Sequence, residues 1–102
     1  MMAHYDSRIG DQSLRRLINQ VIAAEHELLL SIGCPTDPEG IYAVLAGERR
    51  PTPAWPRRRH QALKRRLRRS LGTLLNLEAA QRYLNNGAPW LAVYHAISAG
   101  LS

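Results

Sequence analysis

The sequence predicts an all-α protein, a small bundle of about four helices in which the third helix is amphipathic and strongly basic. Apolar residues recur at steps of three and four along several segments, as they do on one face of an α-helix. No segment shows the strict alternation of apolar and polar residues that is typical of a half-buried strand. A chain of 102 residues that is 45% hydrophobic can bury one core, so we expect residues 1–102 to form a single helical domain.

The first helix is predicted over residues 13–32, after a disordered segment at residues 1–10. Asp11 or Ser13 can cap its start, and Gly33 followed by Pro35 ends it. Its apolar residues cover an arc of roughly 160° on a helical wheel, which is wider than one neighbouring helix requires. We therefore expect this helix to make a second contact, with another copy of the chain or with a partner protein.

A candidate dimer or partner interface lies on this wide face. Its residues are Leu14, Leu17, Ile18, Val21, Glu25 and Leu28. Glu25 falls near the middle of the apolar arc, where an unpaired carboxylate would be costly. We expect it to meet an arginine, a histidine or a water-filled gap, unless it reaches solvent at the edge of the face.

A short second helix is predicted next, and a proline-rich connector follows it. Thr36 or Asp37 can cap this helix, and Pro38 fits its first turn. Its inward residues are Ile41, Val44 and Leu45, and Gly47 ends it. Residues 51–56 contain three prolines, which prevents a continuous helix and predicts a stiff extended connector.

The third predicted helix begins near Arg57 and carries a stripe of leucines. The stripe consists of Leu63, Leu67, Leu71 and Leu74, at steps of four, four and three. Beyond Gly72 the apolar face rotates, so we expect a bend or a break there. Gly87 marks the end of the helical run.

Positive charge is concentrated around this helix. Residues 49–69 hold ten of the 14 lysines and arginines and no acidic residue. The candidate nucleic-acid or acidic-partner contacts are Arg57, Arg58, Arg59, Lys64, Arg65, Arg66, Arg68 and Arg69. These eight would lie along about 18 Å of helix, opposite the leucines. Such a surface is typical of contact with phosphate or carboxylate groups, and arginine favours bidentate contact with phosphate.

A last helix is predicted between Pro89 and Gly100, and it is almost free of charge. One of its faces carries Trp90, Val93, Tyr94, Ile97 and Leu101, and Leu30 lies on the polar side of the first helix. Excess apolar surface of this kind indicates a homodimer or a captured partner protein.

Two stretches show a partial resemblance to helix-turn-helix proteins. Residues 27–53 resemble the second and third helices of Cro-type repressors, although the turn is about two residues longer. Asp37 and Glu39 stand near the start of the helix that would read DNA, where phosphates would repel them. Residues 78–97 are similar to an excisionase-type motif whose reading helix is largely apolar. These resemblances imply sequence-specific DNA binding.

Nothing in the sequence indicates catalysis, and we expect no cofactor and no metal. The four histidines stand in different predicted elements, without the i, i+4 pairing of a helical zinc site. Cys34 is interpreted as a small, semi-buried hydrophobic residue rather than a nucleophile. A glycine-rich phosphate loop and a nucleophile elbow are both missing.

The compartment predicted from the sequence is the cytoplasm. A single cysteine rules out an internal disulfide, and residues 1–6 lack the pattern of a secretory signal. No apolar run is long enough to span a membrane, because Glu25 and Glu27 interrupt the longest candidate.

The preferred hypothesis is a non-enzymatic regulator of gene expression that contacts nucleic acid through the basic helix at residues 57–70. The alternative is an anti-activator or adaptor that sequesters a partner, such as a transcription factor, through apolar helical surfaces. An anionic membrane surface ranks last, because the leucine stripe lacks interfacial aromatic residues.

Overall fold

The computed structural model describes the backbone of residues 7–100 and the side chains of residues 10–100. It contains four α-helices: α1 (Ser7–Ser31), α2 (Pro38–Leu45), α3 (His60–Asn85) and α4 (Pro89–Ser98). A 3-10 turn, η1 (Arg57–Arg59), precedes α3, and no strand occurs between residues 7 and 100. The all-α prediction is therefore confirmed.

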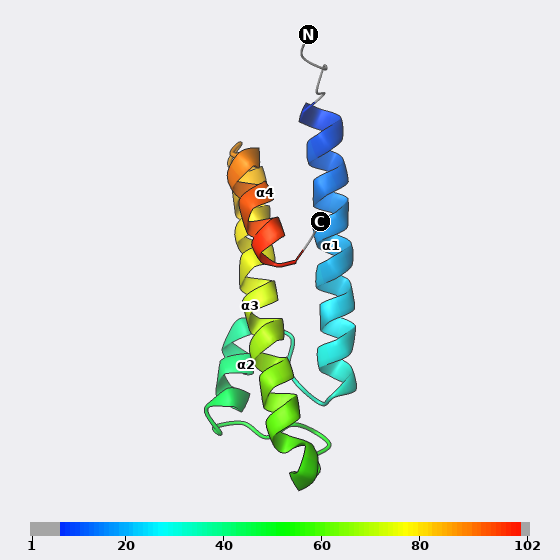
Figure 1. Cartoon of the computed structure of the whole chain (residues 1–102), viewed down its shortest axis with the longest axis vertical. Helices are drawn as coiled ribbons and strands as arrows, with labels where there is room; N and C mark the ends of the chain where they lie inside the picture. Colours follow the sequence, from blue (N-terminus) through cyan, green and yellow to red (C-terminus); the bar gives the residue numbers. More distant parts are fainter. Residues whose placement is uncertain (1–6, 101–102) are drawn as a thin grey trace.

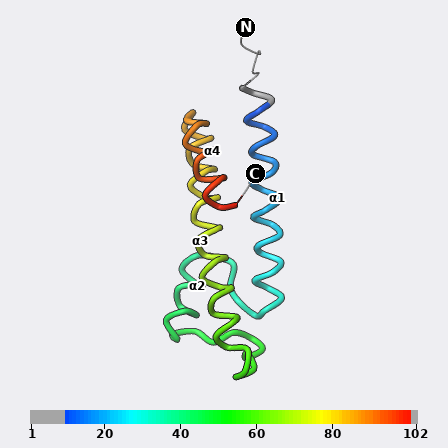
Figure 2. Tube along the Cα trace, in the orientation of Figure 1, coloured from blue at the N-terminus to red at the C-terminus, as the bar shows by residue number. Residues whose placement is uncertain are grey.

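Helix α3 is the central element of the bundle. Helix α1 runs antiparallel to it, α4 folds back along its second half, and α2 packs against its first half (Figure 1). All three helices contact α3, and α1 also contacts α4. The result is a narrow molecule of 59 × 21 × 17 Å, whose length follows the two long helices (Figure 2).

The core consists of two clusters along α3. The first lies where α2 packs and contains Leu29, Cys34, Ile41, Val44, Leu67, Leu71 and Leu74. The second lies where α4 packs and contains Ile18, Leu77, Ala80, Leu84 and Ala92. The predicted stripe of α3, Leu63, Leu67, Leu71 and Leu74, is buried in full. Each of these leucines contributes about 2 kcal/mol through burial, so the stripe is the main support of the fold.

Three predicted features of the long helices differ in the structure: the start of α1, the start of α3 and the break near Gly72. Helix α1 begins at Ser7, so Asp11 and Ser13 lie inside it rather than capping it, and residues 7–10 belong to the helix. The expectation for residues 1–6 lies outside the described part, as does Leu101. Helix α3 continues through Gly72 without a break, although its α-helical part begins at His60 rather than near Arg57.

The continuity of α3 at Gly72 has a physical reason. Gly72 is exposed, and a Cβ at this position would have no neighbouring atom within 4 Å, so a glycine here weakens only local helix propensity. Leu71 and Leu74, on either side, are anchored in the first cluster. The rotated apolar face beyond them is covered by α4, so no bend is needed to bury it.

The short helix α2 forms as predicted but does not sit in a helix-turn-helix arrangement. Asp37 caps it by accepting a hydrogen bond from the backbone N–H of Gly40 at 2.9 Å. Residues 32–37 separate it from α1, and within the described residues α2 packs on α3 and not on α1. The similarity to Cro-type repressors is therefore not matched by the packing of these helices.

The proline-rich connector is fastened to the end of α1 rather than acting as a free spacer. The backbone N–H of Thr52 donates to the carbonyl of Gly33 at 2.9 Å, and Trp55 Nε1 donates to the carbonyl of Ile32 at 2.7 Å. The Trp55 ring packs against the first cluster. Gly33 has a φ of +77°, and a Cβ there would lie 2.5 Å from the carbonyl oxygen of Thr52. Only glycine fits this close approach.

We predict that Gly33→Ala lowers the free energy of unfolding by about 2–4 kcal/mol, because the new methyl group adds a clash with Thr52 to the left-handed strain. Gly47→Ala is the matched control. Gly47 has a φ of +78° and open space around it, so we expect a loss of about 1 kcal/mol from strain alone. Urea denaturation followed by circular dichroism measures both. Equal losses in the two variants would show that the connector is not held against Gly33.

Candidate nucleic-acid interface

The eight predicted basic contact residues gather at one end of the molecule. They lie on η1 and on the first ten residues of α3, at the lower end of α3 in Figure 1. Six of the eight side chains are exposed, and those of Lys64 and Arg66 are half-buried. The buried leucines of the same segment take the opposite side of the helix. The opposition between a leucine side and an arginine side is therefore present in the structure.

In the part of the chain whose side chains are described, none of these basic side chains is paired with a carboxylate. Within residues 10–100, the hydrogen bonds to side-chain carboxyl groups come from the backbone of Gly40, which binds Asp37, and from Ser70, which binds Glu25. The segment 49–69 itself contains no acidic residue. The positive charge at this end of the bundle is therefore open to an external anion.

The end of the molecule that carries these basic residues, which we call the basic end, is hollowed around Trp55. A cleft of about 220 Å³ separates the loop after α2 from α3. Its charged and aromatic walls are Arg49, Arg50, Trp55, His60 and Lys64. Trp55 and His60 pack edge to face, with ring centroids 5.7 Å apart. A shallow hollow over Arg65, Arg68 and Arg69 continues the positive surface along α3.

Arg49 and Arg50 belong to this end of the molecule although they were not among the candidate contacts. Both are exposed, and both line the cleft with Lys64. The sequence contained a signal for them, since the acid-free basic segment begins at Arg49. Their convergence with α3 depends on the turn that follows α2, which local sequence does not specify.

The predicted interface on α1 is largely occupied within the chain. Ile18 is fully buried in the second cluster, so its side chain packs within the bundle and has no area exposed for a partner. Leu14, Val21 and Leu28 are half-buried, and Leu17 is exposed. A partner at this face stays a prediction.

Glu25 has a partner that the sequence did not indicate. Ser70 on α3 donates its hydroxyl to Glu25 Oε1 at 2.5 Å, in place of the expected arginine, histidine or water-filled gap. Ser70 is the buried polar residue of α3, next to Leu71 in the apolar face. Because the two residues are 45 positions apart, periodicity alone could not pair them.

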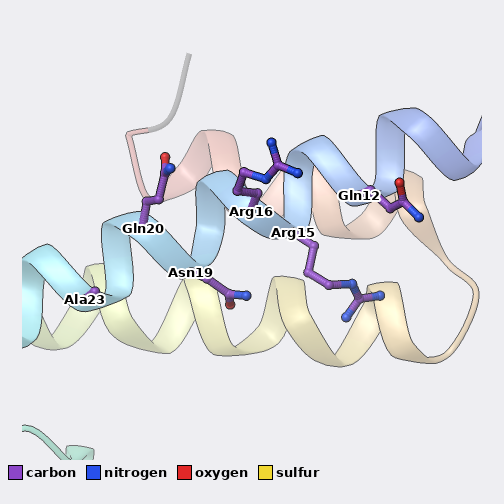
Figure 3. Close-up of a pocket in the computed structure, with 6 residues that line it drawn as sticks. All are labelled: Gln12, Arg15, Arg16, Asn19, Gln20 and Ala23. Atoms are coloured by element: carbon purple, nitrogen blue, oxygen red, sulfur yellow. The ribbon is translucent and has the colours of Figure 1, made fainter.

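A surface hollow of about 490 Å³ lies along α1 and offers little chemistry. Its lining residues all come from that helix: Gln12, Arg15, Arg16, Asn19, Gln20 and Ala23 (Figure 3). Arg15 donates to Asn85 at 2.6 Å, and Asn19 accepts from Gln81 at 2.8 Å. These two side chains tie α1 to the last turns of α3. The lining contains no carboxylate, thiol or imidazole group.

The histidines and the cysteine are dispersed through the described residues. Burial raises the pKa of the Cys34 thiol, against the smaller opposing effect of the positive charge on Arg49. His95 stacks on Tyr83 and is hydrogen-bonded to Asn76, far along the chain from His60. In the part of the chain that the structure describes, no three metal-ligating residues come together. None of the described helices is long and apolar enough to cross a membrane.

Comparison with known proteins supplies no relative. No protein-family model, curated protein or solved structure matches the chain. Its function is therefore inferred from its own surfaces.

We predict that Ser70→Ala lowers the free energy of unfolding by about 2 kcal/mol, because a carboxyl oxygen at the helix interface loses its donor. Ser98→Ala is the control, since the Ser98 hydroxyl binds its own helix at an exposed position, and we expect a change within about 0.5 kcal/mol. Chemical denaturation of both variants measures the difference. An unchanged stability of Ser70→Ala would mean that water replaces the hydroxyl at Glu25 without cost.

Proposed function

We propose that the protein is a non-enzymatic regulator of gene expression that binds nucleic acid through its basic end. The observation that supports this most is the run of ten basic residues without an acid in segment 49–69, eight of them exposed. A surface of one sign destabilises the folded chain by self-repulsion. A polyanion that binds there relieves the repulsion and releases its own counterions.

The chemistry of this end fits phosphate. Nine of the ten basic residues are arginines, whose planar guanidinium groups donate two parallel hydrogen bonds to a phosphate. Helix α3 holds five of the ten on a rigid backbone, because its leucines are fixed in the core. The spacing between these charges is therefore set before binding, which reduces the entropy lost on contact.

The charge of the rest of the chain helps to orient the basic end toward a polyanion. Outside residues 49–69 there are four basic and eight acidic residues, so the remainder of the molecule carries a net charge of −4. A positive end on a mildly negative body turns toward a polyanion as it approaches. The single cysteine, which leaves no internal disulfide, fits a reducing compartment such as the cytoplasm.

A second candidate function is an anti-activator or adaptor that holds a partner protein. Large apolar side chains are exposed on α1, α2 and α4, among them Leu30, which is 65% exposed, Tyr42 and Trp90. In this function the apolar surfaces cover part of a transcription factor, and the basic end meets an acidic patch on it.

We predict that the double variant Arg65→Glu/Arg69→Glu binds duplex DNA roughly 100-fold more weakly than the wild type at about 0.1 M salt, because two phosphate contacts are lost. Both side chains are exposed, so the fold is retained. The matched control is Arg16→Glu/Arg82→Glu, which changes the net charge equally at exposed positions outside the basic end. Retention on immobilised DNA and fluorescence anisotropy measure the affinities.

Equal losses in the two double variants would show that net charge, and not the basic end, governs binding. A wild type that binds neither DNA nor RNA at that salt would contradict the proposal. Recovery of one protein on the wild-type chain from its source cell, without nucleic acid, would favour the second candidate.

A further inference from the structure

Helix α4 turns its bulky apolar side away from the bundle. Trp90, Tyr94 and Ile97 are 71%, 64% and 63% exposed, and Val93 is 43% exposed. Their spacing places them on one face over two helical turns, and we call these four residues the α4 stripe. The opposite face carries Ala92 and Ala96, which are buried in the bundle.

We infer that the α4 stripe is the two-fold interface through which two copies of this chain form a homodimer. This inference goes beyond the proposed function and does not depend on it. The proposed function concerns the basic end, whereas α4 packs along the other half of α3 (Figure 1). Three properties of the stripe favour a second copy as its occupant: its area, its lack of charge and the ordered position of Tyr94.

The exposed area is close to what a small dimer needs. Two aromatic residues exposed to this extent offer about 150 Å² each, and with Val93 and Ile97 the stripe exposes on the order of 500 Å². That is at the upper end of the apolar patches found on monomers. Specific interfaces bury about 800 Å² on each partner, so a flanking contribution of about 300 Å² completes one.

The flanking surface is available on α1. Ala99, just beyond α4, packs on the same cluster as Leu14 and Val21, and α4 contacts α1 directly. Leu14 and Val21 are half-buried, and Leu17 on the same helix is exposed. In the proposed dimer the part of the predicted α1 interface that stays accessible, chiefly Leu17, adds to the area of the α4 stripe.

The stripe complements itself. Helix α4 contains no aspartate, glutamate, lysine or arginine, so two copies can meet without burying a charge. A two-fold axis between Val93 and Tyr94 runs the helices antiparallel. Trp90 then faces Ile97 of the other copy, and Val93 faces its Tyr94, so every bulky residue meets another apolar one.

Tyr94 of the stripe is already held in place. Tyr94 packs edge-on against His95, with ring centroids 5.2 Å apart. His95 in turn stacks on Tyr83 at 5.3 Å and is hydrogen-bonded through Nδ1 to Asn76 Oδ1 at 3.0 Å. A side chain that is ordered before contact loses less entropy on association, which favours binding.

Sedimentation equilibrium tests the inference directly. We expect the wild type to be a dimer over about 1–100 µM, and the single variants Trp90→Asp and Ile97→Lys to dissociate at least about 30-fold more readily, because each buries an unpaired charge. Both changes suit the helix, since an acid near its start and a base near its end favour the dipole, and circular dichroism checks that the helices persist. Leu30→Asp, at an equally exposed position on α1, should leave the dimer intact.

The double variant Trp90→Asp/Ile97→Lys tests the antiparallel register. It places opposite charges at the paired positions of the two copies, so we expect it to recover about tenfold of the affinity lost in either single variant. A double variant weaker than both singles would overturn this register. A wild type that is monomeric at 100 µM, or single variants that stay dimeric, would overturn the α4 interface and leave the stripe to another protein.

These outcomes are separate from those of the proposed function. Arg65→Glu/Arg69→Glu should remain a dimer while it loses DNA, because its changes lie on the first half of α3. Trp90→Asp should still bind DNA through the basic end of the monomer, but it should lose the added affinity that a dimer gains from two basic ends.

Discussion

Burial of the leucine side of α3 is the constraint on which the rest of the structure depends. Leu67, Leu71 and Leu74 hold α2 and the end of α1, and Leu77 and Leu84 hold α4 and the first half of α1. Because Leu63, Leu67 and Leu71 occupy one side of the first half of α3, the basic residues interleaved with them lie toward solvent. The fold and the positive surface are thus two consequences of one pattern. A substitution that weakened the leucine side would also loosen the spacing of the charges.

Much of this fold could be predicted from the sequence, because the spacing of apolar residues and the residues that cap helix ends act locally. Helix α2 lies between a capping Asp37 and a left-handed Gly47, and the leucine stripe of α3 is buried as predicted. The errors arise where tertiary contacts override local preference. Helix α3 passes through Gly72 because its leucines are anchored on both sides, and Trp55 docks on the carbonyl of Ile32, 23 residues away.

The orientation of α4 shows most clearly what periodicity cannot settle. Both faces of this helix are apolar, so hydrophobicity alone does not choose between them. In the structure the alanine face is turned inward: Ala92 and Ala96 are buried, and Ala92 shares the second cluster with Ala80 of α3. Small residues allow two helix backbones to approach closely, and the bulky stripe is left outside.

The candidate site, too, could be predicted only in part from the sequence. The basic residues of η1 and α3 are evident from composition, but their meeting with Arg49 and Arg50 depends on the loop after α2.

The molecule therefore has two surfaces of different chemistry: a basic end at the first half of α3, and an apolar stripe on α4, which packs against the second half of α3. We propose that the basic end holds phosphates. The salt dependence of duplex DNA binding by the wild-type chain measures this most directly, because the slope of log K against log salt counts the phosphates that are neutralised. With six exposed basic residues on η1 and α3, we expect a slope of about −5. A slope flatter than about −1, or no binding even at low salt, would contradict the claim.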